Sequence, residues 1–164
     1  MFPFLQDKLK GGTKNLRAIA VEPSACASLT QGTREYDFGD TAGTTPLMMM
    51  QTLGRGFVPS PVPAGGLRYH GSAPLVSHLL GAGAIEAEAY HQGEVFESAV
   101  KFARCEGTIP APESAHAIHS VVQHAMAARE SGGKTVIVFN LSGHGLFDLG
   151  AYDAFLDKRM ALEA

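Results

Sequence analysis

A short loop at residues 140–145 (NLSGHG) has the residue types of a ligand-binding turn. It follows an apolar, β-branched run at residues 134–139, which predicts a buried strand of a parallel sheet. Open α/β sheets bind their ligands at the carboxyl ends of such strands. Ser142 offers a hydroxyl there, and Gly143 and Gly145 allow a close backbone approach. A plain glycine turn between a strand and a helix is the alternative, and the pattern alone leaves both open.

Two further segments could supply charge or backbone oxygens to a ligand. Glu106 ends a predicted helix just before a turn, where its charge opposes the helix dipole unless another group holds it. A solvated side chain at a frayed helix end is the alternative. Residues 65–71 (GGLRYHG) could present backbone carbonyls to a cation or form a substrate loop. A connection that merely needs glycine would have the same pattern.

The histidines invite a metal interpretation that the pattern does not complete. Glu113 and His116 are spaced i, i+3, like half of a di-iron carboxylate site, with His119 and His124 nearby. The second pair and the further glutamates that such a site needs are missing. Polar residues beside the apolar stripe of a helix are therefore the favoured interpretation. Motifs of protein kinases, P-loop proteins and serine hydrolases are likewise incomplete or missing.

The elements that must position these residues alternate between helix and strand, which predicts an α/β fold with a mainly parallel sheet. We predict strands at residues 16–21, 85–90 and 134–139. We predict helices at residues 23–29, 44–53, 73–80, 93–105 and 113–128, followed by a helical tail. A glycine- and proline-rich stretch at residues 54–66 is long enough for a linker or a functional loop.

Composition sets outer limits on the function. The 164 residues suffice for one domain with a sizeable core. A net charge of −3 disfavours nucleic acid as a partner, because phosphates select basic surfaces. No apolar run approaches the roughly 18 residues of a membrane span, so a membrane protein is not expected. Two isolated cysteines, Cys26 and Cys105, fit a reducing compartment such as the cytoplasm. The apolar start at residues 1–5 lacks the features of a secretory signal and has the pattern of a helix entered midway.

Four segments taken together resemble one known family. They occur in the order 36–46 (YDFGDTAGTTP), 64–71 (AGGLRYHG), 106–117 (EGTIPAPESAHA) and 140–145 (NLSGHG). This set resembles the C-terminal part of the tryptophan synthase β chain, more closely its alpha-independent variety, and residues 21–23 (VEP) also fit. The resemblance covers essentially the whole chain.

The resemblance implies a fold-type II enzyme dependent on pyridoxal 5′-phosphate (PLP), which joins L-serine to indole to give L-tryptophan and water. The implied fold has three layers, α/β/α, around a mainly parallel sheet that this chain leaves incomplete. Ser142 matches the serine whose hydroxyl faces the pyridine nitrogen, with Gly143 in the same cofactor-binding loop. A neutral partner there leaves the nitrogen largely unprotonated and favours β-elimination and replacement over transamination. Glu106 matches a carboxylate close to the ring.

The resemblance also implies a monovalent cation bound through backbone carbonyls of Leu67, Tyr69 and Gly71. In the family, the Schiff-base lysine and the glycine-rich phosphate cradle precede the matched region. None of the six lysines lies in the family's lysine motif. We therefore expect residues 1–164 to be a C-terminal domain that lacks the N-terminal half and is inactive by itself. The alternative is a non-catalytic assembly module that completes a separately encoded N-terminal half. A homo-oligomer is also expected.

Overall fold

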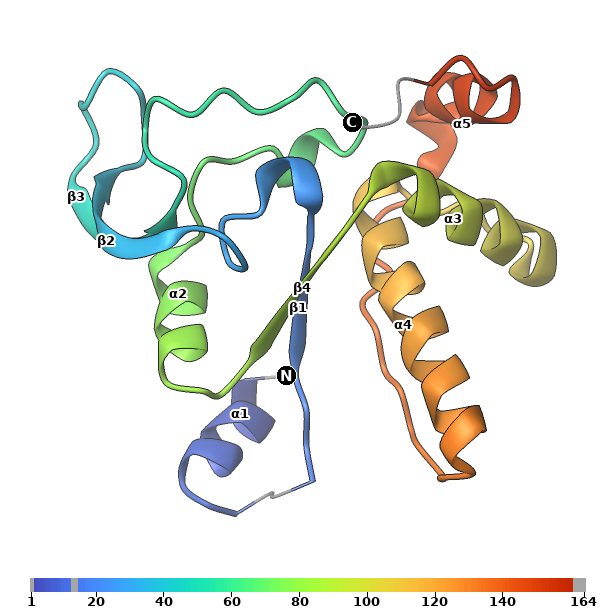
Figure 1. The fold of residues 1–164 in the computed structure, drawn as a ribbon, viewed down its shortest axis with the longest axis horizontal. Helices are drawn as coiled ribbons and strands as arrows, with labels where there is room; N and C mark the ends of the chain where they lie inside the picture. The colour runs from blue at the N-terminus through green and yellow to red at the C-terminus, as the bar shows by residue number, and fades with distance from the viewer. Residues whose placement is uncertain (1, 13–14, 161–164) are drawn as a thin grey trace. The chain divides into compact units, whose positions relative to one another are not determined.

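The computed structural model describes residues 2–12 and 15–160, which form a mixed α/β structure divided into two compact units (Figure 1). Unit 1 comprises the described parts of Met1–Glu22, Cys26–Pro59 and Tyr69–Ala89. Unit 2 comprises the described parts of Pro23–Ala25, Ser60–Arg68 and Tyr90–Ala164. No helix in the described ranges is long and apolar enough to cross a membrane.

A small parallel sheet, in which β1 (Ile19–Pro23) pairs with β4 (Glu86–Tyr90), belongs to unit 1 except for the last residue of each strand. Helices α1 (Phe2–Leu9) and α2 (Pro74–Gly81) belong to the same unit. The buried core side chains are Leu5, Ala18, Leu79, Ala84 and Ile85. The predicted helix at 73–80 and strand at 85–90 are confirmed, and the first predicted strand is confirmed with later bounds. The apolar start of the chain is helical, as its pattern indicates.

The predicted helix at residues 44–53 is wrong, because the apolar run forms strand β3 (Leu47–Thr52). It pairs antiparallel with β2 (Thr33–Phe38), in a register that joins Phe38 to Leu47 and Thr33 to Thr52. The turn between the strands is held by Asp40, whose carboxylate accepts hydrogen bonds from the backbone amides and hydroxyls of Thr44 and Thr45. A short apolar run fits either a helix or a strand, and here the partner strand decides.

The predicted helix at residues 23–29 is reduced to one 3-10 turn, η1 (Ser24–Cys26). The buried carboxylate of Glu22 accepts hydrogen bonds from the amides of Leu29 (2.9 Å) and Thr30 (2.8 Å). These amides are therefore satisfied by a side chain instead of by a continuing helix.

Unit 2 is built on the helices α3 (Gln92–Glu106), α4 (Pro112–Ser131) and α5 (Leu149–Leu156). The 3-10 turns η2 (Gly65–Leu67) and η3 (Gly145–Phe147) also belong to it. The core side chains are Val95, Phe96, Ala99, Ala115 and Tyr152. Left-handed glycines end the two long helices, Gly107 with φ +70° and Gly132 with φ +68°. The predicted helices at 93–105 and 113–128 and the helical tail are confirmed.

The predicted strand at residues 134–139 is wrong in this structure, where the segment is irregular. Val136 is 91% exposed and Val138 is 82% exposed. A strand needs a hydrogen-bonding partner, and the described part of unit 2 contains no complete strand that could pair with it. The α/β class is confirmed. The described strands, however, form two separate two-stranded sheets, one parallel and one antiparallel.

We predict that Phe96→Ala will destabilise the 164-residue chain by about 3–5 kcal/mol, since it empties the centre of the unit 2 core. Phe96 is 1% exposed, and its ring lies 5.0 Å from that of Tyr152 and 5.6 Å from that of Phe155. Urea unfolding provides the measurement. Phe147→Ala is the matched control, because Phe147 is 95% exposed and its loss should change stability by less than about 0.5 kcal/mol. Equal effects of the two substitutions would contradict the assigned core.

Candidate functional site

The loop at residues 140–145 is fastened to the segment that joins α3 to α4. Pro110 and His144 form an isolated antiparallel bridge. The amide of Gly145 donates to the Ile109 carbonyl (2.8 Å), and the amide of Ala111 donates to the Gly143 carbonyl (3.4 Å). Backbone pairing thus brings together two of the motif segments, 106–117 and 140–145, within unit 2.

Ser142 has its backbone held and its side chain exposed. The hydroxyl of Ser114, in the first turn of α4, donates a hydrogen bond to the Ser142 carbonyl oxygen (2.7 Å). Ser114 is 3% exposed, whereas Ser142 is exposed. Among the residues that the structure describes, no hydrogen bond engages the Ser142 hydroxyl. A free hydroxyl on an anchored backbone can donate to or accept from a ring nitrogen, so this residue fits the cofactor that the resemblance implies.

The two loop glycines are required for different reasons. Gly143 has φ +97°, a left-handed conformation that other residues rarely adopt. A Cβ atom on Gly145 would lie 2.5 Å from the Pro110 carbonyl oxygen, so the close approach of the two backbones excludes a larger residue. These constraints explain the glycines without requiring that they touch a ligand.

Tyr152 supports the segment at residues 109–111, and sequence reasoning missed it. Its buried hydroxyl donates to the Pro110 carbonyl (2.6 Å). Burial, with a smaller contribution from the nearby charge of Asp148, raises the pKa of the Tyr152 hydroxyl well above its usual range. The hydroxyl therefore remains a protonated hydrogen-bond donor at ordinary pH. No signal short of the tertiary structure places it there, because 42 residues separate the partners.

The two candidate carboxylates of unit 2 lie in different surroundings. Glu106 is exposed at the end of α3, directly before the left-handed Gly107. Glu113 lies in the first turn of α4, where its Oε1 atom accepts a hydrogen bond from the Gly66 amide (2.8 Å). Glu113 is also the immediate neighbour of Ser114, the residue bonded to Ser142. The spacing of Glu113 and His116 gives no sign of the bond to Gly66.

Two histidines of α4, His116 and His119, take part in packing. His116 Nδ1 lies 2.8 Å from the Pro112 carbonyl, and His119 Nδ1 lies 2.8 Å from the Ser98 hydroxyl. Both side chains are buried. Within the described ranges, no group of three or more histidine, cysteine, aspartate or glutamate residues is arranged to hold a metal ion.

The predicted cation loop crosses the division between the units, which falls between Arg68 and Tyr69. In unit 2, Leu67 ends the η2 turn. In unit 1, Tyr69 is 62% exposed, and Gly71 lies opposite Thr52 in an isolated bridge. In the part of the chain that the structure describes, no hydrogen bond reaches the carbonyl oxygens of Leu67, Tyr69 or Gly71. Free carbonyl oxygens are suitable ligands for a hard cation.

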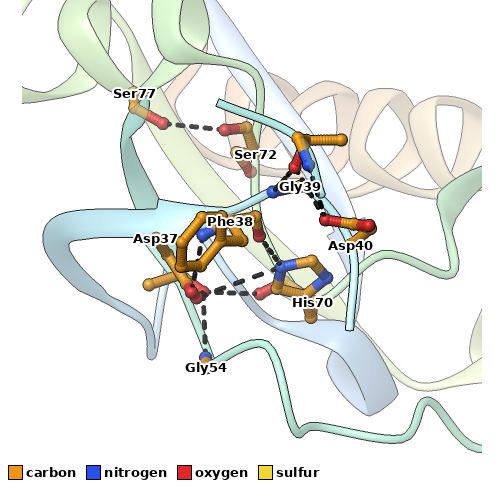
Figure 2. A network of polar contacts seen from close by, with 10 residues as sticks. Asp37, Phe38, Gly39, Asp40, Gly54, His70, Ser72 and Ser77 are labelled. Carbon is orange, nitrogen blue, oxygen red and sulfur yellow. Dashed lines mark hydrogen bonds and ion pairs between the residues drawn. The ribbon is translucent and has the colours of Figure 1, made fainter. Parts of the chain in front are cut away.

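A network of polar contacts fixes the unit 1 part of this loop to the β2–β3 hairpin (Figure 2). His70 Nε2 lies 2.9 Å from the Phe38 carbonyl, so the ring nitrogen must be the donor. The His70 carbonyl accepts from the Leu53 amide (2.7 Å), and the Ser72 amide donates to the Gln51 carbonyl (2.9 Å). The backbone on both sides of Gly71 is therefore held by strand β3 and by Leu53, the residue that directly follows it.

Asp37 is the buried charge of this network, at 8% exposure. The Thr52 hydroxyl donates to its Oδ2 atom (2.7 Å), and this hydrogen bond is the main cause that lowers the pKa of the Asp37 carboxyl. Burial opposes the shift. The hydrogen bond from the Phe38 amide and smaller electrostatic contributions from His70 and Arg55 add to it. The His70 ring nitrogen lies 4.0 Å from the carboxylate.

We predict that Asp37→Asn will destabilise the chain by roughly 1–3 kcal/mol at neutral pH, because it removes a hydrogen-bonded buried charge. The folded-state pKa is lowered, so the ionised form stabilises the fold above the ordinary pKa of aspartate. That contribution is lost as the pH falls through the folded-state value. The stability difference between wild type and Asp37→Asn should therefore stay constant at neutral pH and shrink as the pH falls below about 4 in urea unfolding. Asp157→Asn, at an exposed ion pair with Arg159, is the control and should show little effect. A pH-independent difference at Asp37 would contradict this account.

Comparison with known proteins places these motifs in one family. No protein-family model matches the chain. It is 59% identical over 157 residues to tryptophan synthase beta chain 2 of Aquifex aeolicus, a match that covers 94% of this chain and 36% of the relative. It is 57% identical over 152 residues to tryptophan synthase beta chain 2 of Thermotoga maritima, covering 93% of this chain and 36% of the relative.

A tryptophan synthase beta chain of Thermosipho africanus is 55% identical over 152 residues, a match that covers 93% of this chain and 36% of the relative. The chain thus spans about a third of the length of the curated relatives that it matches. The resemblance stated from the four motifs is confirmed: over nearly its whole length, this chain is homologous to one part of the tryptophan synthase β chains.

Proposed function

We propose that this chain forms the C-terminal part of a PLP-dependent tryptophan synthase β chain, which condenses L-serine with indole to L-tryptophan and water. The observation that carries the proposal is identity of 52–59% to proteins with that name over more than nine-tenths of the chain. The anchored loop with a free Ser142 hydroxyl supports it from the structure. The alternative, a non-catalytic assembly module, has no specific observation in its favour.

Within this proposal, Ser142 and Gly143 would be among the residues that hold the cofactor. Bound PLP supplies an electron sink for the chemistry at the substrate's α-carbon. The Ser142 hydroxyl would hold the cofactor as a neutral hydrogen-bond partner of its pyridine nitrogen, which would leave that nitrogen largely unprotonated. Gly143 keeps the backbone close, since it carries no side chain to intervene. Glu106 is the carboxylate that the family resemblance assigns near the ring.

The proposed monovalent cation binds through the backbone carbonyls of Leu67, Tyr69 and Gly71. Support comes from the free carbonyl oxygens and from the contacts that His70 and Ser72 make with strand β3. Such a cation would stabilise one loop conformation without taking part in bond making. The site would then affect the reaction through the position of the loop.

Both units together would form the C-terminal domain of a fold-type II enzyme, residues 1–164, with the three-layer α/β/α arrangement completed by the remainder of the enzyme. Exposed Val136 and Val138 support this view, because β-branched residues are suited to a sheet. A cytoplasmic location and assembly into a homo-oligomer belong to the same proposal, as for a biosynthetic enzyme.

The first test of the proposal is a tryptophan assay with PLP, L-serine and indole. We expect no turnover by the 164-residue chain alone, because the Schiff-base lysine of the family lies outside the matched region. Joined to an N-terminal part taken from a relative, the chain should form tryptophan. In that complete protein, Ser142→Ala should lower kcat by roughly tenfold or more and alter the visible absorbance of bound PLP. Turnover by the 164 residues alone would overturn the expectation that the matched region is inactive by itself.

The second test concerns the exposed segment at residues 134–139. We expect the isolated chain to self-associate through it, because exposed apolar surface with unpaired backbone favours association. The double substitution Val136→Lys/Val138→Lys should shift the chain toward monomer in sedimentation velocity. Val58→Lys is the control, since Val58 is 85% exposed elsewhere in the chain. A monodisperse wild-type monomer would contradict the expectation.

A further inference from the structure

We propose that Ser114 is a positioning residue that acts through Ser142, an inference that rests on the proposed function. Its hydroxyl donates to the Ser142 carbonyl oxygen at 2.7 Å, and its side chain is 3% exposed. Ser114 therefore directs the exposed hydroxyl of Ser142 without itself meeting the cofactor. The contact joins residues 28 positions apart, both in unit 2.

Of the hydrogen bonds that hold Ser142 and Gly143, the one from Ser114 is the shorter, at 2.7 Å. On the far side, the Gly145 amide is bound to the Ile109 carbonyl at 2.8 Å. At Gly143, the bond from the Ala111 amide is long, 3.4 Å, near the limit of a useful hydrogen bond. The orientation of the Ser142–Gly143 peptide thus depends chiefly on the Ser114 hydroxyl.

That peptide needs such a restraint because of the residue that follows it. Gly143 has φ +97° and, as a glycine, has access to several backbone conformations of similar energy. The peptide group is planar, so a fixed carbonyl oxygen fixes the whole plane beside the Ser142 Cα atom. The direction of the Ser142 side chain is set from that Cα atom. Without the bond from Ser114, the peptide can rotate and carry the hydroxyl away from a ring nitrogen.

Ser114 lies in a tightly packed first turn of α4. Pro112 begins α4 and is fully buried, and Ala115, directly after Ser114, is 0% exposed in the core of unit 2. The Ala115 amide donates to the Ala111 carbonyl at 3.0 Å, which closes the first turn of the helix. A hydroxyl on this turn has a fixed origin, as a positioning group requires.

The test uses the complete protein, in which this chain is joined to an N-terminal part taken from a relative and loaded with PLP. We expect Ser114→Ala to lower kcat about tenfold and to change the visible absorbance of bound PLP in the same direction as Ser142→Ala. Ser114→Thr keeps the hydroxyl and should remain within about threefold of wild type. Ser131→Ala, at the exposed end of the same helix, is the matched control and should match wild type.

A double-mutant cycle separates positioning from general stability. If Ser114 acts through Ser142, then Ser114→Ala should have less than about a twofold further effect in the Ser142→Ala background. Multiplicative losses, or wild-type absorbance and kcat in Ser114→Ala, would overturn the inference while Ser142→Ala still reports on the proposed function. A wild-type protein that neither binds PLP nor forms tryptophan would instead overturn the proposed function, and this inference with it.

Discussion

The backbone of residues 109–111 is the point on which the arrangement of unit 2 depends. Its polar groups bond to the loop at 140–145 through Ile109 and Ala111, and to α5 through the contact of Pro110 with Tyr152. The Pro110 side chain is fully buried. Buried backbone groups must find partners, so a shift of this segment would leave several of them unsatisfied at once. The segment also fixes where α4 begins, and with it the places of Glu113 and Ser114.

The β2–β3 hairpin has a comparable part in unit 1. Asp37 and Thr52 bond to each other across the two strands, and His70 attaches the following loop to Phe38. These side-chain contacts add to the backbone bridge between Thr52 and Gly71. In each unit, buried groups hydrogen-bond the backbone of the loop that is expected to bind a ligand. The Ser142 hydroxyl and the carbonyl oxygens of Tyr69 and Gly71 make no hydrogen bond among the described residues.

Much of the helical structure could be predicted because its boundaries are local. Pro74 and Pro112 start helices, and Gly107 and Gly132 end them, so the bounds follow from residue types within one turn. The runs at 44–53 and 134–139 could not be assigned correctly. Both are short and apolar, and their structure depends on whether a partner strand is present, which no local pattern contains.

The candidate site, too, could be predicted from the sequence only in part. The loop of Ser142 and Gly143 could be identified from its glycines and from its place after an apolar run. The residues that hold it could not, because Ser114 and Tyr152 reach partners 28 and 42 positions away along the chain. The bond between Glu113 and Gly66 could not be predicted either, because 47 positions separate the two residues.

The Asp40 turn has a consequence for the order in which the molecule assembles. Its hydrogen bonds close loops of only four and five residues, to Thr44 and Thr45. Closing so short a loop loses little chain entropy, and hairpins of this kind form within roughly 1–10 μs. During synthesis, the hairpin emerges long before residue 142. We expect β2 and β3 to be paired on the ribosome while the Ser142 loop still awaits its partners, so that the loop is among the last parts to reach its final shape.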